Sequence, residues 1–581
     1  MHFLTLHALQ LSPHKIIMSS LFPILTWLKT YRREDFNGDL FAGIITAILL
    51  VPQGIAYALL AGLPPEFGLY ASILPPFFYA ILGTSRTISV GPVAVAAIMI
   101  AAALTSPAVS ALGNPTQSAI ILSAQTGVIM LIMAACRMGG LVNFISHPVL
   151  TGFTSGASLL IIVSQLPKTF GLNTPSCAID LACYEQYFRG TNFFVLAISA
   201  GVFALLLFFS KPLPALLGKI GAPKILITAI SKCGGLISVA ITTFAVMQWH
   251  LIDQHVAVVG FVPTGFPALH FDFFDIEKWK VLFPSASFIA LIAYVESIAI
   301  AKVVANLRNE KISPNQELVA LGVANIASAI SGGMPAAGGL SRTMVNFAAG
   351  ACTQVATIIA TIILTLAVMF CSEWFYNIPK ATLAVIILVA ILPLVKLRSI
   401  FHTWHYDRGD GIAELVTLLG VLALGIEEGI MLGIFLTFIS HVRKASRPHI
   451  AVVGRLPNSK HFRNVKRHNV ETWENLLLMR IDENITFANI NFIEEFIENE
   501  LRNVPKVQHI VLIFTSVSDI DMTAIEALEQ LNHSLKNIGI TLNFAEVKGF
   551  LLDKLEKSDL FTHLYGERFF DAEEAITKLN S

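Results

Sequence analysis

The chain has 581 residues, of which 55% are hydrophobic and 13% are charged, and its 39 basic and 39 acidic side chains give a net charge of zero. Soluble globular proteins carry about a quarter charged residues, so this composition indicates an integral membrane protein. The zero net charge argues against nucleic acid as a dominant partner. Acidic residues are scarce before about residue 470, and the sequence after that point has the composition of a soluble α/β domain.

Residues 1–35 are predicted to be a cytoplasmic N-terminal segment. The stretch MHFLTLHALQLSPHK lacks the charged n-region and the small-residue cleavage site of a signal peptide. From Met18 the sequence MSSLFPILTWLKTYRRED has the pattern of an amphipathic lead-in. Translation from Met1 and translation from Met18 are therefore both open.

Residues 36–446 are predicted to form a transmembrane domain of fourteen spans. A span needs about 20 apolar residues, or fewer where the helix is discontinuous. The third and tenth stretches are doubtful as full crossings, because they begin at ISVGPVAV and GGLSRT. Matching interrupted segments in two halves indicate a seven-plus-seven inverted repeat, here about 36–250 and 284–446. The stretches are 38–61, 67–83, 91–109, 117–136, 147–166, 191–210, 227–250, 284–305, 317–331, 340–350, 353–372, 380–396, 411–425 and 427–445.

The distribution of Lys and Arg sets the orientation. With a cytoplasmic N-terminus most basic residues fall in inside segments, as the positive-inside rule requires. Both termini are then expected in the cytoplasm. The outside loops carry only Lys168, Arg189, Lys278, Lys280 and Lys380.

The first stretch contains Pro52-Gln53-Gly54 well inside an apolar run. Gln53 offers an amide to a ligand, and Tyr57 lies one helical turn later on the same face. A ligand role is favoured for Gln53. The alternative is that its amide satisfies backbone groups freed by Pro52.

The third and tenth stretches each contain a helix start inside the membrane. Gly91-Pro92 precedes a strong helical run in the third stretch, and Gly338, Gly339, Ser341 and Arg342 open the tenth. Each helix N-terminus carries about half a positive charge, so two facing N-termini create an anion site that Arg342 reinforces. Glycine and proline placed merely for close helix packing would leave the intramembrane Arg342 unexplained.

The cysteines are predicted to be packing residues, with one exception. Cys177 and Cys183 share the loop NTPSCAIDLACYEQ. A disulfide between them is permitted only outside the cytoplasm, which is where the predicted orientation places this loop. Whether they form one is left open.

Glu296 lies deep in the eighth apolar stretch. An intramembrane carboxylate is by default a functional residue, and desolvation favours its protonated form, so Glu296 could bind and release a proton during transport. The alternative is a permanent pair with Arg342. A sodium site needs several converging oxygens, and Ile300 one turn on from Glu296 favours a proton instead.

The remaining polar intramembrane residues are predicted to stabilise the fold. Asn325, Ser328 and Asn346 are expected to be hydrogen bonders in helix packing. No metal-ligand spacing, nucleophile–base motif or phosphate-binding glycine loop appears, so the sequence predicts neither an enzyme nor a cofactor.

The C-terminal part is predicted to be a small sheet covered by helices. Residues 447–469 are expected to be a linker, and residues 470–581 alternate strands and helices. Asp521 and Thr523 stand at a predicted helix start, where capping is the ordinary role. They are also candidate regulatory residues or part of a loop that binds a cytoplasmic protein.

The stretch from GDLFAGIITAILLVPQGIAYALLAG to SRTISVGPVAV resembles the first quarter of the SulP family of sulfate permease-like anion transporters. NQELVALGVANIASAISGGMPAAGGLSRTMVNFAAGACTQ resembles the second-half signature of that family, and the tail resembles a STAS domain. The resemblance implies a core domain of spans 1–4 and 8–11 that moves against a gate domain of spans 5–7 and 12–14. It also implies a homodimer with STAS contacts.

In that family the anion lies between the N-termini of the third and tenth spans, and the coupling carboxylate of bacterial members corresponds to Glu296. The family pattern GGFSR or GSFSR reads GGLSR here, so Leu340 replaces an aromatic residue and leaves the size of the substrate open. The candidate substrate-binding residues are Gln53, Tyr57, Gly91, Val93, Ala94, Gly339, Leu340, Ser341 and Arg342.

The functional hypothesis is a secondary transporter of the bacterial inner membrane that imports sulfate, bicarbonate or a dicarboxylate, with a proton, by an elevator-like movement. Sodium coupling, anion exchange and an uncoupled anion channel are the alternatives. A membrane-tethered signalling module is disfavoured by the intact Gln53, Ser341 and Arg342.

Overall fold

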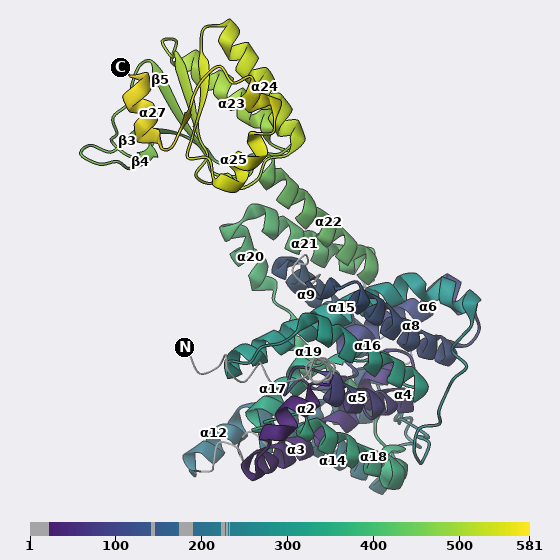
Figure 1. Ribbon diagram of the computed structural model, residues 1–581. Coiled ribbons are helices and arrows are strands. Elements are labelled where there is room, and N and C mark those ends of the chain that lie inside the picture. The colour runs from purple at the N-terminus through teal and green to yellow at the C-terminus, as the bar shows by residue number, and fades with distance from the viewer. Residues whose placement is uncertain are drawn as a thin grey trace. The chain divides into compact units, whose positions relative to one another are not determined.

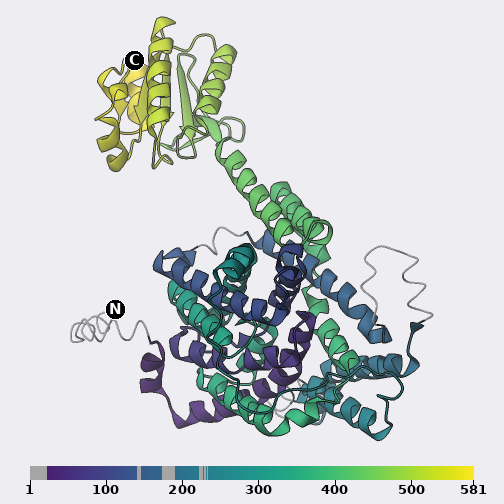
Figure 2. The same ribbon diagram turned by 90° about the vertical axis from the view of Figure 1, so that its right-hand side faces the viewer.

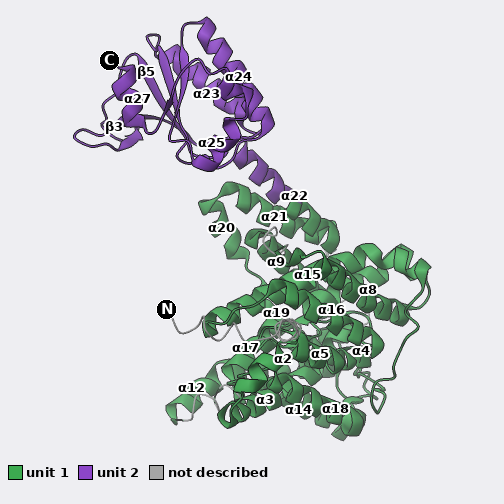
Figure 3. Cartoon of the chain, viewed as in Figure 1, with its two compact units in different colours: residues 1–434 green, residues 435–581 purple. Residues whose placement is uncertain are grey.

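The computed structural model describes residues 22–140, 146–172, 190–221, 227, 230–231 and 233–580. The chain divides into two compact units, Met1–Ile434 and Phe435–Ser581 (Figure 1, Figure 3). The predicted pair Cys177 and Cys183 and the alternative starts Met1 and Met18 lie outside the described residues.

The first unit is helical, and every predicted apolar stretch coincides with a helix or a pair of helices. Seven helices of the described part are long and apolar enough to cross a membrane, and the count of fourteen spans stays a prediction. The helices are α3 (Arg33–Leu60), α4 (Pro65–Tyr70), α5 (Leu74–Leu82), α6 (Ala94–Thr105), α8 (Pro115–Ala135), α9 (His147–Phe170), α11 (Phe193–Ser210), α14 (Gly234–Gln248), α15 (Ile276–Arg308), α16 (Pro314–Ile330), α17 (Leu340–Ala348), α18 (Val355–Phe375), α19 (Lys380–Ile391), α21 (Arg408–Ala423) and α22 (Ile426–Ala445).

Shorter helices connect these elements. The short helix α20 precedes α21 and was not predicted, because it has only ten residues and a mixed polar sequence. The connecting helices are α2 (Ile24–Trp27), η1 (Leu28–Thr30), α7 (Pro107–Ser110), α12 (Pro212–Lys219), η3 (Leu392–Leu394) and α20 (Leu397–Tyr406).

Two packing groups make up the first unit. Helices of both sequence halves interleave in one group, where α8 packs on α16 and α3 packs on α18. In the other group α9 packs on α19 and α21. Glycine permits the closest approaches: a Cβ atom added at Gly127 of α8 would lie 2.6 Å from the carbonyl oxygen of Gly322 of α16.

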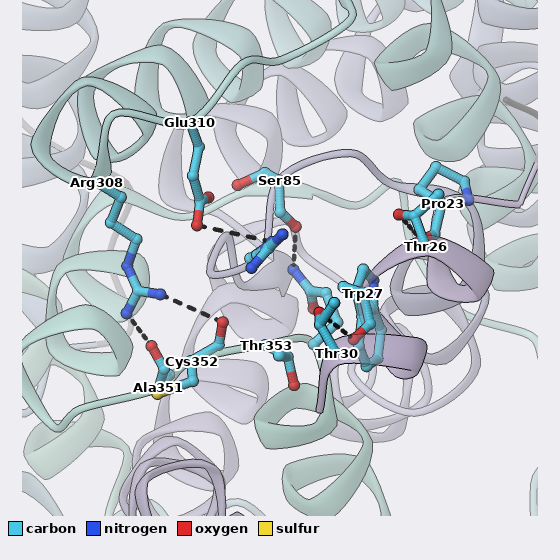
Figure 4. A network of polar contacts seen from close by, with 12 residues as sticks. Pro23, Thr26, Trp27, Thr30, Ser85, Arg308, Glu310, Ala351, Cys352 and Thr353 are labelled. Atoms are coloured by element: carbon cyan, nitrogen blue, oxygen red, sulfur yellow. Dashed lines mark hydrogen bonds and ion pairs between the residues drawn. The ribbon is translucent and has the colours of Figure 1, made fainter. Parts of the chain in front are cut away.

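Polar contacts tie the end of α15 to the segment that precedes α18. Arg308 donates to the carbonyl oxygens of Ala351 and Cys352 (Figure 4). The fully buried Asp39 of α3 accepts from the backbone N–H groups of Cys352 and Thr353, at 2.6 and 2.9 Å. A buried carboxylate is stable only when it is hydrogen-bonded, so this cluster fixes three segments of both halves together.

Two short strands interrupt the helices at the predicted breaks. β1 (Val90–Gly91) pairs antiparallel with β2 (Ala337–Gly338), with Val90 opposite Gly338 and Gly91 opposite Ala337. Every backbone polar group in a membrane needs a partner within the protein. The β1–β2 pairing supplies those partners where the helices are interrupted.

The second unit contains a six-stranded sheet with the order β4-β3-β5-β6-β7-β8. Strands β5 to β8 are parallel, whereas β3 is antiparallel to both β4 and β5. Figure 2 shows helices on both faces of this sheet. Alternation within β5 explains the two cores: Leu477 and Met479 face one core, and Leu476 and Leu478 face the other. The elements are β3 (Ile450–Arg455), β4 (Phe462–Asn464), β5 (Leu476–Ile481), α23 (Ile490–Asn503), β6 (His509–Ile513), α24 (Met522–Asn537), β7 (Thr541–Ala545), α25 (Gly549–Leu555), α26 (Asp559–Thr562), β8 (Arg568–Phe569) and α27 (Ala572–Leu579).

The segment 447–469, expected to be a linker, carries β3 and β4 and is part of the sheet. The reason is a hairpin: the apolar run IAVV is followed by the turn residues PNS, and Val453 then pairs with Asn464. Asp521 caps α24 as predicted, since its side chain accepts from the N–H of Ala524 at 2.9 Å. The exposed Thr523 lies in the first turn of that helix, and a regulatory role for either residue stays a prediction.

Candidate functional site

The two interrupted helices begin at the β1–β2 pair. Val93 is the N-cap of α6 and Gly339 is the N-cap of α17, each within two residues of a paired strand. Extended N-cap residues followed by a helix leave the first backbone N–H groups without partners inside that helix. Both helix starts line one cavity of about 410 Å³, which lies within the first unit.

Most predicted site residues line this cavity. They come from α3, α6, α15 and α17, which are brought together across both halves of the chain. The predicted residues at the cavity wall are Gln53, Tyr57, Val93, Ala94, Glu296, Gly339, Leu340, Ser341 and Arg342.

Arg342 is buried, with 2% of its surface exposed. Its Nη1 donates to the carbonyl oxygen of Pro92 at 2.7 Å and to Oε1 of Gln53 at 3.3 Å. Its Nε and Nη2 are buried and have no hydrogen-bond partner in the described structure. A buried donor without a partner carries a desolvation cost, and an anion in the cavity would remove that cost.

Two glycines make room for the guanidinium. A Cβ atom at Gly339 would lie 2.9 Å from Nη2 and 3.0 Å from Cζ of Arg342, and one at Gly91 would lie 3.2 Å from Nη2. Gly91 is therefore behind Arg342 and is not at the cavity wall. The sequence explained these glycines by the helix break alone, because the position of a side chain from the other half of the chain is not visible locally.

Gln53 and Tyr57 lie one turn apart on α3, which continues through Pro52. The Gln53 amide oxygen accepts from Arg342. In the described part of the chain no bond joins it to the backbone near Pro52, so the geometry favours a role for Gln53 in orienting Arg342 at the cavity.

Glu296 lines the cavity from α15 and is partly exposed to it. Within the described residues it forms neither a hydrogen bond nor an ion pair shorter than 4.0 Å, so it is not paired with Arg342 here. The next residue, Ser297, has a different role: its Oγ accepts from the N–H of Gly338 at 2.7 Å and holds β2.

Asn325 and Asn346 stabilise the backbone of the breaks, as predicted for hydrogen bonders in packing. Asn325 bonds both the N–H and the carbonyl oxygen of Ala336, at 2.9 and 3.0 Å. Asn346 donates to the carbonyl oxygen of Thr87 at 3.0 Å.

The opposite wall of the cavity was not predicted. It is formed by α9 and by the end of α19, with His147, Thr151, Thr154 and Lys396 as its polar residues. The signal that could have found them is spacing, because positions 147, 151 and 154 share one helical face. No group of His, Cys, Asp and Glu that could hold a metal ion occurs among the described residues.

The first unit is a helical membrane unit with a cavity built from two helix N-termini and a buried arginine, and the chain continues into a separate α/β unit. These features define the class of the protein, a multi-pass membrane transporter of anions. The chain belongs to the sulfate permease family, whose sequence pattern matches residues 36–417. The pattern of the STAS domain matches residues 467–576. This is a family of transporters and not of enzymes.

Among curated proteins, the chain is 31% identical over 568 residues to the probable sulfate transporter 4.2 of Arabidopsis thaliana, covering 95% of this chain and 82% of that protein. It is 32% identical to the chloroplastic sulfate transporter 4.1 of the same plant, over 90% of this chain and 77% of that one. It is 30% identical to the high affinity sulfate transporter 2 of Stylosanthes hamata, over 94% and 84%.

Among solved structures, SLC26A9 superposes with a TM-score of 0.88 at 21% identity, covering 98% of this chain and 94% of that one. The transmembrane domain of a cyanobacterial bicarbonate transporter, BicA, gives 0.57 at 19% identity, covering 69% of this chain and 98% of that one. At these identities the likeness shows the fold alone.

Proposed function

We propose that the protein is a secondary active transporter of a small anion, which binds between the N-termini of α6 and α17. The observation that carries the proposal is Arg342, a buried cation that lines a cavity and whose Nε and Nη2 have no hydrogen-bond partner in the described structure. Two helix N-termini add about one unit of positive charge to that of the guanidinium. Gln53 and the Pro92 carbonyl hold Nη1, so the guanidinium is fixed at the cavity before the anion arrives.

Sulfate is the first candidate substrate, because the relatives that match along almost the whole chain are named as sulfate transporters. Bicarbonate and dicarboxylates such as succinate satisfy the same donors. The replacement of an aromatic residue by Leu340, whose side chain is 42% exposed, leaves more room at the cavity wall.

We infer that Glu296 couples transport to a proton. An ionised Glu296 at the wall of the same cavity repels a bound anion, and protonation removes that charge. Proton and anion are then bound together, which is symport. Coupling to sodium, anion exchange and an uncoupled channel are the alternatives. The transport assay below separates sodium coupling from proton coupling, and both of these from the two uncoupled alternatives.

The division of the cavity wall favours an elevator-type movement. Gln53, Glu296 and Arg342 all belong to the packing group of α3, α6, α8, α15, α16, α17 and α18, here the core group. The opposite wall belongs to α9 and α19, here the gate group. A substrate whose polar contacts come from the core group can travel with it while the gate group stays in place. The predicted topology has fourteen spans with both termini and the STAS domain in the cytoplasm.

The curated sulfate transporters named above are plant proteins. For this chain a bacterial inner membrane is proposed from the sequence. A homodimer is likewise proposed from the resemblance to the family.

The first test is uptake of radiolabelled sulfate, bicarbonate and succinate into proteoliposomes, with and without an inward proton or sodium gradient. We expect accumulation of sulfate that depends on the proton gradient. Accumulation driven by sodium would overturn the proton coupling. Flux that ignores both gradients would favour an exchanger or a channel, and the absence of flux for all three anions would overturn the choice of substrates.

Substitution Glu296→Gln is expected to abolish the proton-driven accumulation while anion binding is retained, because a glutamine is neutral at every pH. Uptake measured at several pH values checks this. Glu277→Gln, at an exposed position in the first turn of the same helix, is the matched control and should behave as the unmodified protein. Unchanged dependence on pH in Glu296→Gln would remove Glu296 from the coupling step.

A further inference from the structure

A second, smaller cavity lies between α3, α9 and α19, which are three of the helices that border the central cavity. Its volume is about 120 Å³, far above the roughly 10–15 Å³ needed for one water molecule. Ala56 and Leu59 of α3 form one side, Gln165 and Lys168 of α9 another, and Lys380 of α19 lies at a third.

Both cavities lie along the boundary between the core group and the gate group, here called the seam. They lie at different positions along the helix axes. On α9 the central cavity extends to Thr154, and the second cavity begins at Gln165, which is about 16 Å further along the helix axis. On α3 the two approach each other, because Tyr57 lines the central cavity and Ala56 lines the second. The second cavity is therefore on the side of the membrane away from His147 and Lys396, which is the outside in the predicted topology.

Two lysines line this cavity, and none of the described residues that line it is acidic. In the part of the chain that the structure describes, the side chains of Lys168 and Lys380 form no ion pair within 4.0 Å and no hydrogen bond. Like charges at one cavity repel each other, and a bound anion replaces that repulsion with attraction to both.

Helix electrostatics explain one lysine and not the other. Lys168 is in the last turn of α9, where a cation is stabilised by the helix dipole. Lys380 is the first residue of α19, where the dipole disfavours a cation. The negative end of α9 and the positive end of α19 oppose each other, so the two ammonium groups dominate the field at this cavity, and an anion stabilises that arrangement.

We propose that Lys168 and Lys380 form an outer capture site for a small oxyanion, from which the anion enters the central cavity when the seam opens. Its place on the transport route rests on the proposed function, whereas its capacity to attract an anion does not. The capture site differs from the central site in its donors. Its two flexible ammonium groups attract anions with little discrimination by shape, whereas Arg342 and the helix N-termini of the central site discriminate between anions by their geometry.

The test is the rate at which thiol reagents modify Lys168→Cys in the full-length reconstituted protein, followed at that residue by mass spectrometry. An anionic reagent, sulfonatoethyl methanethiosulfonate, is compared with the uncharged hydroxyethyl reagent. With Lys380 present we expect preferential reaction with the anionic reagent, slowed by added sulfate. Adding Lys380→Gln should reduce the anionic rate about tenfold relative to the uncharged rate. The ratio is used because loss of a neighbouring ammonium group lowers the thiolate fraction and slows both reagents alike, and continued reaction with the uncharged reagent shows that the cavity is intact.

Lys280→Gln removes a charge predicted on the same side of the membrane, at an exposed position outside this cavity, and is the control. It should not alter the ratio of the two rates, and Lys380→Arg should preserve the preference. A ratio that is unaffected by Lys380→Gln, or equally affected by Lys280→Gln, overturns the proposal. Because labelling needs no transport, a preference without sulfate uptake would sustain the capture site and count against the proposed function. Sulfate uptake without the preference for the anionic reagent would sustain the proposed function and overturn the capture site.

Discussion

Arg342 is a buried cation whose guanidinium is held, within the described structure, through only one of its three nitrogens. One nitrogen is held by Pro92 and Gln53, and the other two have no hydrogen-bond partner among the described residues. An isolated buried charge is costly unless it is paired. In the proposed anion site, this uncompensated charge is the source of affinity for an anion.

Substitution Gly339→Ala is expected to weaken anion binding while the fold is retained. The added Cβ would lie 2.9 Å from Arg342 Nη2, so the guanidinium must shift. A displacement of this kind should raise the half-saturation concentration for transport about 10- to 100-fold. Kinetics of radiolabelled sulfate uptake measure it.

The control for this variant is Gly201→Ala on α11, where an added Cβ meets no atom within 4 Å. It should leave uptake unchanged. Equal kinetics for Gly339→Ala and Gly201→Ala would show that the position of the guanidinium does not limit binding.

At the scale of residues, the sequence predicted which side chains line the cavity better than it predicted which residues contact them. Gln53, Glu296 and Arg342 stand out because polar residues are costly in apolar helices, and all three line one cavity. His147 and Thr151 were missed because they belong to the start of a helix with ordinary amphipathic spacing. The contact of Gly91 with Arg342 was missed because it joins distant parts of the chain.

At the scale of elements, the breaks at α6 and α17 depend on side chains that replace missing helical hydrogen bonds. β1 and β2 pair with each other, Ser297 holds Gly338, and Asn325 holds Ala336. Glycine and proline predicted the breaks. The strand pairing has no sequence signal, because two residues are too few to show a period. The β3–β4 hairpin did carry a signal, an apolar run followed by turn residues.

Substitution Asn325→Leu tests this support. It removes the partners of the Ala336 N–H and carbonyl groups in a buried position, at a cost of about 1–3 kcal/mol for each group. We expect a clear drop in the unfolding temperature of the purified protein, measured by tryptophan fluorescence. Asn315→Leu, which loses one bond to the Ala134 carbonyl in a partly buried position, should cost less. An unfolding temperature unchanged by Asn325→Leu would mean that the break is held by β1 and β2 alone.

At the scale of the whole transmembrane unit, the proposal requires the core group to move past the gate group. Ala56 on α3 and Ile387 on α19 line the same small cavity from the two groups. In a variant whose native cysteines are replaced by serine, cross-linking Ala56→Cys to Ile387→Cys with a short thiol reagent should abolish uptake. Cleaving the cross-link should restore it.

The matched pair for this experiment is Gln165→Cys with Ile387→Cys, since α9 and α19 both belong to the gate group. Cross-linking these two positions should be tolerated. Continued uptake by the cross-linked Ala56–Ile387 pair would contradict a rigid-body movement along this seam.

The pairing of β1 with β2 also has a consequence for biosynthesis. Val90 and Gly91 are translated long before Ala337 and Gly338, with which they pair. Until the second half of the chain leaves the ribosome, the start of α6 has no strand beside it and cannot be buried in lipid without exposing bare backbone. The start of α6 must therefore be shielded by the insertion machinery or by water during that time, and the proposed anion site cannot form before Ala337 and Gly338 have been synthesised.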